Sequence, residues 1–226
     1  MSQRTTFIAS LLLLLPGFVL AANTARSELD AAKRAKPDAT HGEILFAQCT
    51  QCHGARGGGD PNGSTPRIAG QYYQVIVKQL VDFRYGKRWD FQMEGMADRH
   101  HLATAQDIAD VAAFVSSQPR SGDQGIGSGE FATLGASIYG RQCQSCHGVD
   151  GVGDGSNGVP RLGGQHYGYL LRQMYNAVDG RRPTLPQLHS TRIEPLDFNE
   201  VRAVSDYLSR LGATAAARDT SSLPPQ

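Results

Sequence analysis

The sequence predicts an all-α protein built as a tandem pair of similar modules. Apolar residues recur at the three- and four-residue spacing of an amphipathic helix, as at Tyr73, Ile76, Leu80 and Phe83. No βαβ pattern is found, and the helical pattern of the first half returns in the second half at a fixed offset. Self-similarity at a fixed period is the sequence signature of a structural repeat. A chain of 226 residues has room for two such modules.

The repeat offset is 94 residues over most of the module and 93 residues in its last helix. The residues that match at an offset of 94 are Cys49, Cys52, His53, Gln71, Tyr73, Gln79 and Gly86, with Cys143, Cys146, His147, Gln165, Tyr167, Gln173 and Gly180. The residues that match at an offset of 93 are Ile108, Val111 and Phe114, with Val201, Val204 and Tyr207. One residue is therefore missing from the second module between Arg182 and Leu196.

The first module begins after a polar, Ala-rich lead-in over residues 22–40, for which one helical turn is expected. A short helix is predicted from Gly42 to Cys49. Residues 54–70 are predicted to be a loop, because their density of glycine and their Asp-Pro-Asn-Gly stretch would break a helix. Another helix is predicted from Gln71 to Gly86, where the glycine ends it.

Residues 87–103, which include Trp89 and two methionines, are predicted to be a loop. The last helix of the module follows, with Thr104 as its N-cap and Asp107 three residues later. Asp197 has the role of Thr104 in the second module. The predicted buried stripe of the first of these helices consists of Ile108, Val111, Ala112 and Val115.

These boundaries divide the chain into five parts. The predicted domains are a signal peptide at 1–21, a first module at 22–119, a Gly-rich linker at 120–129, a second module at 130–212 and a disordered tail at 213–226. Each module alone is small for a stable apolar core.

The first 21 or 22 residues read as a targeting segment. Arg4 makes a positive start, an apolar run follows from Phe7 to Leu20, and small residues allow cleavage after Ala21 or Ala22. The run of 14 residues is shorter than the ~20 needed to span a bilayer. The mature chain is therefore expected to be a soluble, exported protein.

Every cysteine of the chain lies in one of two Cys-x-x-Cys-His motifs, at residues 49–53 and 143–147. This pattern is the attachment signature of c-type haem. Two residues between the sulfurs let one helical turn span an edge of the porphyrin, and the adjacent histidine becomes the proximal iron ligand. The candidate attachment residues are Cys49, Cys52, Cys143 and Cys146, and the candidate proximal ligands are His53 and His147.

A Cys-x-x-Cys pair also occurs as a redox dithiol, a structural disulfide or half of a zinc site. A zinc site of four cysteines usually places its pairs roughly 15–20 residues apart, whereas these pairs are 94 residues apart. A thioredoxin-like dithiol needs a surrounding βαβ pattern, which is not found. The sequence therefore predicts two covalently bound haem c groups.

The chain resembles the dihaem cytochrome c4 family. The resemblance is carried by the leader, the two Cys-x-x-Cys-His-Gly motifs, and a Pro-Arg-[Ile/Leu]-[Ala/Gly]-Gly-Gln-x-Tyr segment after each motif, at 66–73 and 160–167. It implies two class I cytochrome c domains packed haem to haem, each built around a covalently bound haem c. It also implies a periplasmic carrier of single electrons, without catalytic residues, between a quinol-oxidising complex or periplasmic dehydrogenase and an acceptor such as a terminal oxidase.

The resemblance further implies a distal methionine in each module, 12 residues before the first apolar residue of the last helix. In the first module this position is Met96, and Met93, His100 and His101 are the other candidates.

The second module departs from this pattern. No methionine follows Met174, which lies inside a predicted helix and is expected to be a core residue. The same count back from Val201 reaches His189, which predicts two histidine ligands, His147 and His189, for the second haem. His166 and an open, five-coordinate iron are the alternatives.

Unequal distal ligands predict unequal reduction potentials. A methionine thioether favours ferrous iron and raises the potential, whereas a second imidazole favours ferric iron and lowers it. Electrons are therefore expected to enter at the second haem and to leave from the first. The resemblance also implies that the carbonyls of Pro66 and Pro160 accept hydrogen bonds from the proximal histidines. Arg67 and Arg161 are expected either to bind haem propionates or to be solvated at the surface.

The alternative function is a dihaem subunit of a periplasmic oxidoreductase, of the thiosulfate dehydrogenase or peroxidase type, with a labile sixth ligand. A third class, a haem-based gas sensor, lacks an output domain in this sequence. A net charge of +1 without a run of basic residues argues against a nucleic-acid partner. The expected partners are redox proteins, among them a membrane-bound oxidase or quinol-oxidising complex, that bind transiently through small patches.

Overall fold

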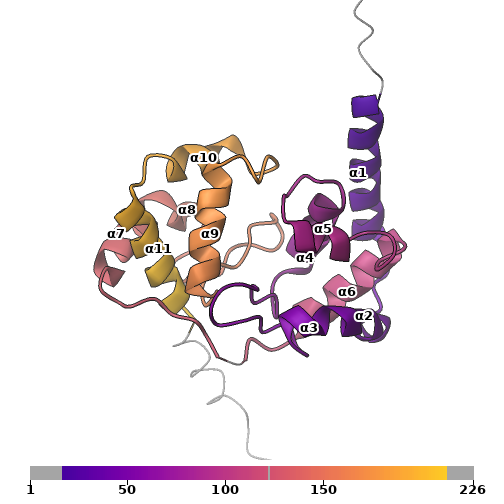
Figure 1. Cartoon of the computed structure of the whole chain (residues 1–226), viewed down its shortest axis with the longest axis horizontal. Coiled ribbons are helices and arrows are strands. Elements are labelled where there is room, and N and C mark those ends of the chain that lie inside the picture. The colour runs from indigo at the N-terminus through magenta and orange to yellow at the C-terminus, as the bar shows by residue number, and fades with distance from the viewer. Residues whose placement is uncertain (1–16, 122, 213–226) are drawn as a thin grey trace, which may run out of the picture.

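The computed structural model describes residues 17–121 and 123–212, with side chains from residue 24 onward. This part of the chain forms two helical modules that lie side by side (Figure 1). The helices of the first module are α1 (Gly17–Arg34), α2 (Ala39–Phe46), η1 (Ala47–Cys49), α3 (Thr50–His53), α4 (Tyr73–Arg84), α5 (Phe91–Met96) and α6 (Ala105–Ser117). Those of the second are α7 (Ala132–Gln142), α8 (Gln144–His147), α9 (Tyr167–Val178), α10 (Gln187–Ile193) and α11 (Phe198–Arg210). Apart from one isolated bridge between Asp154 and Val159, the described residues contain no β-structure, which confirms the all-α prediction.

The repeat is visible in the helix boundaries. α4 and α9 each contain 12 residues and begin 94 residues apart, at Tyr73 and Tyr167. α6 and α11 each contain 13 residues and begin 93 residues apart. Both predicted N-caps, Thr104 and Asp197, form capping boxes with the residue three positions later. The change of offset before the last helix is therefore a structural feature of the chain.

In each module two helices pack closely together where they cross at a glycine. α2 crosses α6 at Gly42, where a Cβ atom would lie 2.0 Å from the carbonyl oxygen of Asp110. α7 crosses α11 at Gly135, where a Cβ atom would lie 2.0 Å from the carbonyl oxygen of Ala203. Any side chain at either position would push the helices apart. The predicted stripe packs into the first of these crossings and is buried throughout, at Ile108, Val111, Ala112 and Val115.

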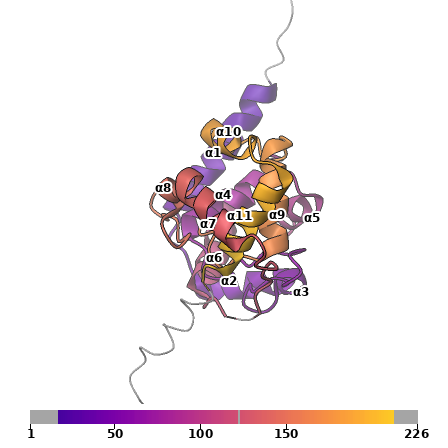
Figure 2. The ribbon, with the colours of Figure 1, turned by 90° about the vertical axis from the view of Figure 1, so that its left-hand side faces the viewer.

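Two segments differ from the sequence prediction. One helical turn was expected in residues 22–40, but residues 22–34 form most of α1, which packs against α4 and α6. Ala25 and Ala32 are buried there, so two small residues two turns apart make a contact face within a polar composition. The N-terminal end of α1 projects away from the module in both views (Figure 1, Figure 2). The predicted loop 87–103 contains the short helix α5, capped by the side chain of Asp90.

The predicted signal peptide (1–21) lies mostly outside the described ranges, and the predicted tail (213–226) lies wholly outside them. No helix in the described part of the chain is long and apolar enough to cross a membrane. The linker, 120–129, is described except at residue 122 and contains neither helix nor strand. It contacts both modules, since Arg120 donates to the carbonyl of Ala69 and the Gly129 N–H donates to Asp206.

The two modules exchange hydrogen bonds through a pair of repeat-related glutamines. The Gln71 side chain accepts from the Arg161 N–H and donates to the Arg161 carbonyl, each at 3.0 Å. The Gln165 side chain accepts from the Arg67 N–H at 2.9 Å and donates to the Arg67 carbonyl at 2.7 Å. Both glutamines are buried. Each amide therefore acts as a bridging peptide group that pairs with the other module's backbone.

A second set of repeat-related residues also meets between the two modules. Arg88 is buried and donates to Gln79 of its own module and to Gln173 of the other module, at 2.5 and 2.8 Å. Arg88 and Arg182 are themselves 94 residues apart. Burial, followed by the charge of Arg88, lowers the pKa of Arg182 to about 10. Equivalent residues of the two copies thus converge at the interface.

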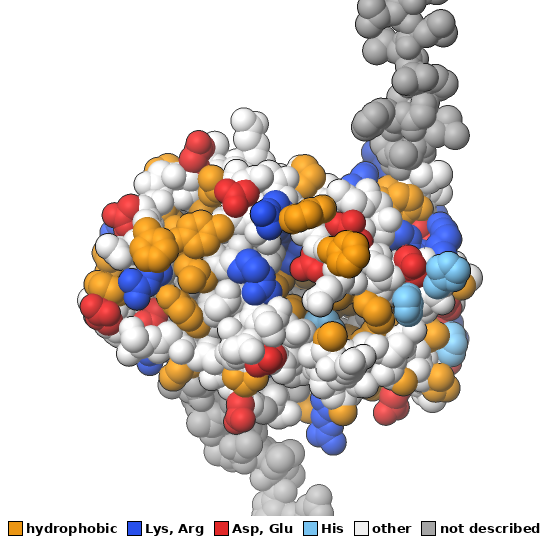
Figure 3. Space-filling model, viewed as in Figure 1, with side chains coloured by type: hydrophobic (Ala, Val, Ile, Leu, Met, Phe, Trp, Pro, Cys, Tyr) orange, Lys and Arg blue, Asp and Glu red, His pale blue; other side chains and the backbone are white. Residues whose placement is uncertain are grey.

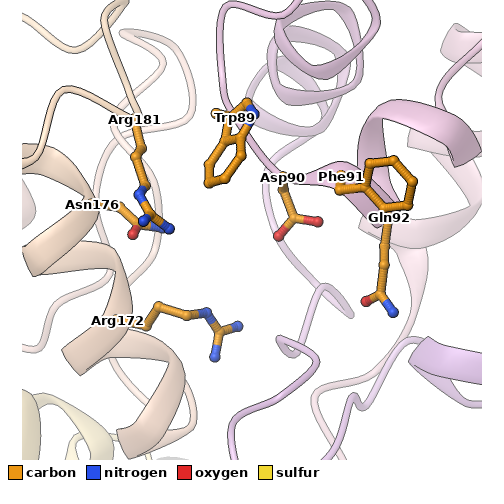
Figure 4. A pocket seen from close by; sticks show the side chains of 7 residues that line it. All are labelled: Trp89, Asp90, Phe91, Gln92, Arg172, Asn176 and Arg181. Atoms are coloured by element: carbon orange, nitrogen blue, oxygen red, sulfur yellow. The ribbon is translucent and has the colours of Figure 1, made fainter.

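At the rim of the interface, residues of α5 and α9 and the stretches beside them line an open pocket (Figure 4). The guanidinium of Arg181 lies over the Trp89 ring, 4.6 Å from its centre. The backbone N–H of Trp89 donates to the backbone carbonyl of Arg181 at 2.8 Å. This stacking joins the segment before α5 to the segment after α9.

Replacing Gln165 by alanine removes both hydrogen bonds to the backbone of Arg67 and leaves its N–H and carbonyl buried without these partners. Because each unsatisfied buried group costs about 1–3 kcal/mol, Gln165→Ala is expected to lower the free energy of unfolding by about 2 kcal/mol or more. Denaturant titration of the protein measures this change. The exposed Gln92 provides a control, since Gln92→Ala is expected to change stability by less than about 0.5 kcal/mol. A Gln165→Ala protein as stable as its parent would contradict the role given to this bridge.

Candidate haem sites

The first Cys-x-x-Cys-His motif ends in a buried histidine whose orientation is set by the backbone. His53 is the last residue of α3, and its Nδ1 lies 3.2 Å from the carbonyl oxygen of Pro66. A carbonyl can only accept, so Nδ1 carries the proton and Nε2 keeps a lone pair. Burial lowers the pKa of His53 below its usual value, although the Pro66 contact opposes this. The imidazole is therefore neutral and oriented, as a metal ligand requires.

The second motif repeats this arrangement. His147 ends α8, is buried, and places its Nδ1 3.1 Å from the carbonyl oxygen of Pro160. Burial again lowers its pKa. Both expected histidine–proline hydrogen bonds are thus confirmed.

The four cysteines of the two motifs differ in exposure. Cys49 and Cys143 are half-buried, and Cys52 and Cys146 are exposed. Burial raises the pKa of Cys49 and of Cys143 to about 11. Thiols with raised pKa values are poor dithiol redox centres, because the thiolate is the reactive form. Among the described residues no three His, Cys, Asp or Glu side chains gather into a metal site, so the two Cys pairs do not form a zinc centre.

His189 lies opposite the proximal histidine of the second module. It is the third residue of α10, and its ring centre is 6.3 Å from that of His147, with the rings inclined at 68°. Two imidazoles that bind one metal ion from opposite sides, at about 2.0–2.1 Å each, have ring centres roughly 6 Å apart. The buried Nδ1 of His189 has no hydrogen-bond partner. Burial, then the charges of His147 and Arg182, lower the pKa of His189 to about 4, so the imidazole is neutral at physiological pH.

In the first module the corresponding short helix carries both methionine candidates. Met93 and Met96 lie three residues apart on α5 and are half-buried, so they share one side of the helix. Met96 ends α5, whereas His189 stands near the start of α10. The two distal segments therefore differ in helix register as well as in side chain.

The competing histidine of the second module is engaged elsewhere. His166 is 0% exposed, its Nδ1 accepts from the Gly125 N–H at 3.2 Å, and its Nε2 lies 2.8 Å from the carbonyl oxygen of Gly58. Both ring nitrogens are used, so His166 is an interface residue that joins the linker to the first module. Met174 packs against the second core and accepts a hydrogen bond from the Ser205 hydroxyl, as expected of a core residue.

Three arginines meet where the two modules face each other. Arg67 is only 4% exposed, which rules out the expected alternative of a solvated surface side chain. Its guanidinium donates to the carbonyls of Gly164 and Asp123. Burial, followed by the charges of Arg161 and Arg67, lowers the pKa of Arg120 to about 9.

This arginine cluster (Arg67, Arg120 and Arg161) is a site of concentrated positive charge. The buried Nε of Arg161 has no hydrogen-bond partner. Buried cations need anionic partners, and guanidinium groups bind carboxylates well. The two carboxylates of a haem are such partners, so the cluster, the oriented histidines and the cysteine pairs all fit haem.

Sequence reasoning overlooked Arg88, Arg120 and Arg182 as members of this polar interface. A signal was present for two of them, because Arg88 and Arg182 match at the 94-residue offset. Arg120 lies in the linker, outside the repeat, and its burial depends on contacts between segments far apart in the sequence.

Comparison with known proteins agrees with this architecture. The family described as "Cytochrome c" matches twice, at residues 39–119 and 132–212. Cytochrome c4 of Pseudomonas aeruginosa is 31% identical over 81% of this chain and 93% of its own length. The thiosulfate dehydrogenase electron acceptor of Thiomonas intermedia is 32% identical over 72% of this chain and 78% of its own length. The crystal structure of reduced cytochrome c4 from Pseudomonas stutzeri superimposes with a TM-score of 0.69 and 31% identity, over 77% of this chain and 99% of that one.

Removing one pair of cysteines tests haem attachment module by module. Replacing both Cys143 and Cys146 by serine is expected to leave one covalent haem per chain, because neither thioether of the second module can form. Intact-mass measurement and haem absorbance after denaturation should both show the loss of one of the two groups. The matched control replaces Cys49 and Cys52 and should lose the other haem. Retention of two covalent haems in either variant would contradict the assignment.

Proposed function

This chain belongs to the dihaem cytochrome c4 family, and from that membership we propose that it carries single electrons in the periplasm between a respiratory donor and an acceptor such as a terminal oxidase. The relatives support a dihaem electron-transfer cytochrome with two covalently bound haem c groups. The predicted signal segment is compatible with the proposed compartment. The proposed donor is a quinol-oxidising complex or a periplasmic dehydrogenase.

We assign the residues of each haem from the geometry around the two motifs. Cys49 and Cys52 would hold the first haem and Cys143 and Cys146 the second, with His53 and His147 as proximal ligands. Bound haem supplies an iron that exchanges one electron between its ferrous and ferric states. His53 and His147 present a lone pair because the proline carbonyls hold their other nitrogens.

The distal ligands in this proposal are Met96 in the first module and His189 in the second. The 6.3 Å between the ring centres of His147 and His189 is the observation that carries the second assignment. His166, the competing candidate, uses both ring nitrogens in other hydrogen bonds, which favours His189. For the first module the support is the place of Met96 on α5, directly before the segment that leads into α6.

The pair of distal ligands gives the molecule a direction for electron flow. The second haem, with two imidazoles, has the lower potential, and the first, with a thioether, has the higher one. Electrons therefore enter at the second module and leave from the first. On the face shown in Figure 3 basic and acidic side chains are interspersed, in keeping with transient partners that use small patches.

A second candidate function is supported by relatives that are named for thiosulfate oxidation. The Thiomonas intermedia protein is named as the electron acceptor of thiosulfate dehydrogenase. In this alternative the chain would be a subunit of such an oxidoreductase and would receive electrons from its catalytic partner. Stopped-flow reduction by a purified thiosulfate dehydrogenase, compared with reduction by a quinol-oxidising complex, separates the two donors.

A redox titration combined with low-temperature EPR tests the proposal directly. The oxidised protein is expected to show one His/Met and one bis-histidine low-spin signal, and the titration two waves, with the bis-histidine haem reduced at the lower potential. A single common midpoint, or the lower potential in the first module, would overturn the proposed direction. A high-spin signal with rapid cyanide binding would instead favour an enzyme.

Replacing His189 by methionine is expected to raise the potential of the second haem by on the order of 0.1 V, within the ~0.8 V range that axial ligands span. His189→Ala should produce a high-spin signal from the second haem alone. His101, which pairs with Asp98 at 3.0 Å, provides the control: His101→Gln should leave both haem spectra unchanged. An unaltered spectrum in both His189 variants would rule out His189 as a ligand.

A further inference from the structure

The helix α1 is an addition to the repeated module. The matched family regions begin at residue 39, whereas α1 ends at Arg34. The second module has no counterpart, because the described residues before α7 belong to the linker and contain no helix. Nevertheless α1 packs against α4 and α6 and buries Ala25 and Ala32. Both alanines follow the predicted cleavage site, so cleavage there would leave this contact intact.

The polar centre of the α1 contact is Glu28, which is only 8% exposed. Its carboxylate pairs with the guanidinium of Arg84 on α4, accepts from the Tyr85 hydroxyl at 2.7 Å and accepts from Arg99 at 3.1 Å. The Arg84 side chain is itself buried. A buried carboxylate shared by two guanidinium groups and a hydroxyl fixes all of these groups in place.

Arg84 transmits this constraint to the segment that follows Met96. Its Nε donates to the carbonyl of Ala97 at 2.7 Å, and its terminal nitrogens donate to the carbonyls of Asp98 and Leu102. One side chain therefore holds three carbonyls of the segment 97–102. Glu28 contacts the far side of the same guanidinium and sets its orientation.

The second module lacks this device. At the 94-residue offset Arg84 corresponds to Val178 and Tyr85 to Asp179, neither of which can act as a cationic or hydroxyl donor. The segment around His189 is tied differently, by Arg192, which donates to the Gln142 carbonyl at 2.6 Å. The clamp formed by Glu28 and Arg84 is thus specific to the module in which the repeat keeps a methionine.

We propose that α1 positions the distal methionine of the first haem, with Glu28 as a positioning residue that acts through Arg84 on residues 97–102. This inference rests on the proposed assignment of Met96 as an iron ligand. The physical reason is that a thioether is a neutral, weakly held ligand, so its residence on the iron depends on how firmly the surrounding backbone is held. In a clamped segment the sulfur stays close to the iron in both redox states.

The test uses Glu28→Gln in the full-length dihaem protein. This variant keeps the size of the side chain but removes the charge that orients Arg84. The expected result is a weaker far-red charge-transfer band of the methionine–iron bond and faster cyanide binding at the ferric first haem, by about 10-fold or more. The EPR signal of the second haem should not change, whereas general unfolding would alter both haems.

Two further variants complete the design. Glu43→Gln on α2 removes an exposed carboxylate of the same module. It should leave the far-red charge-transfer band and the rate of cyanide binding at the first haem unchanged. Arg84→Gln should reproduce the effect of Glu28→Gln, and the double variant should add nothing to Arg84→Gln alone, because Glu28 acts through Arg84. If α1 serves only to stabilise the fold, folded Glu28→Gln protein will show the same charge-transfer band and the same cyanide-binding rate as the parent protein. That result would overturn the inference. Absence of the band from the parent protein would instead overturn the Met96 assignment itself.

Discussion

The hydrogen bond from each proximal histidine to a proline carbonyl is the interaction on which the other features depend. It closes the loop from His53 to Pro66 in one module and from His147 to Pro160 in the other. The loop is otherwise rich in glycine, so this contact gives it a defined path. The residue after each proline is an arginine, and the glutamine that pairs with the other module follows four residues later. The contact that orients each histidine therefore also places the interface residues.

The interface that results has the symmetry of the repeat. Gln71 and Gln165 each pair with the backbone of the opposite arginine, and Gln79 and Gln173 both reach Arg88. The arginine cluster beside these contacts concentrates positive charge, which a nearby anion would stabilise. Haem propionates supply that anion in the proposed function. The cofactor would then hold the modules together as well as carry the electrons.

The two modules differ in how their distal side is built. The second module brings His189 opposite His147 from the helix α10, without a helix equivalent to α1. The first has methionines on α5 and an additional helix whose Glu28 holds Arg84 against the following segment. A strong nitrogen ligand needs less support from the backbone than a thioether does. The extra helix is therefore found where the weaker ligand would need it.

Much of the architecture could be predicted from the sequence, because the relevant forces are local or repeated. Helical periodicity, the caps at Thr104 and Asp197, the two Cys-x-x-Cys-His motifs and the 94-residue offset all depend on neighbouring residues or on comparison of the chain with itself. The same comparison pointed to His189 by counting alone. The helix α1 was missed because its contact face is two alanines and a buried glutamate within a polar stretch, and α5 because it is only six residues long.

Other features were decided only by the tertiary structure. The burial of Arg67, the partial burial of Arg120, the engagement of His166 and the clamp on residues 97–102 all depend on segments that are remote in sequence or lie in different modules. An arginine or histidine has the same local pattern whether it faces solvent or an interface, since its burial depends on what the rest of the chain brings against it. The sequence by itself therefore determined the modules, their motifs and the proximal sites. Packing between the modules, and of α1 against the first, decided which polar side chains are held at fixed positions around those sites.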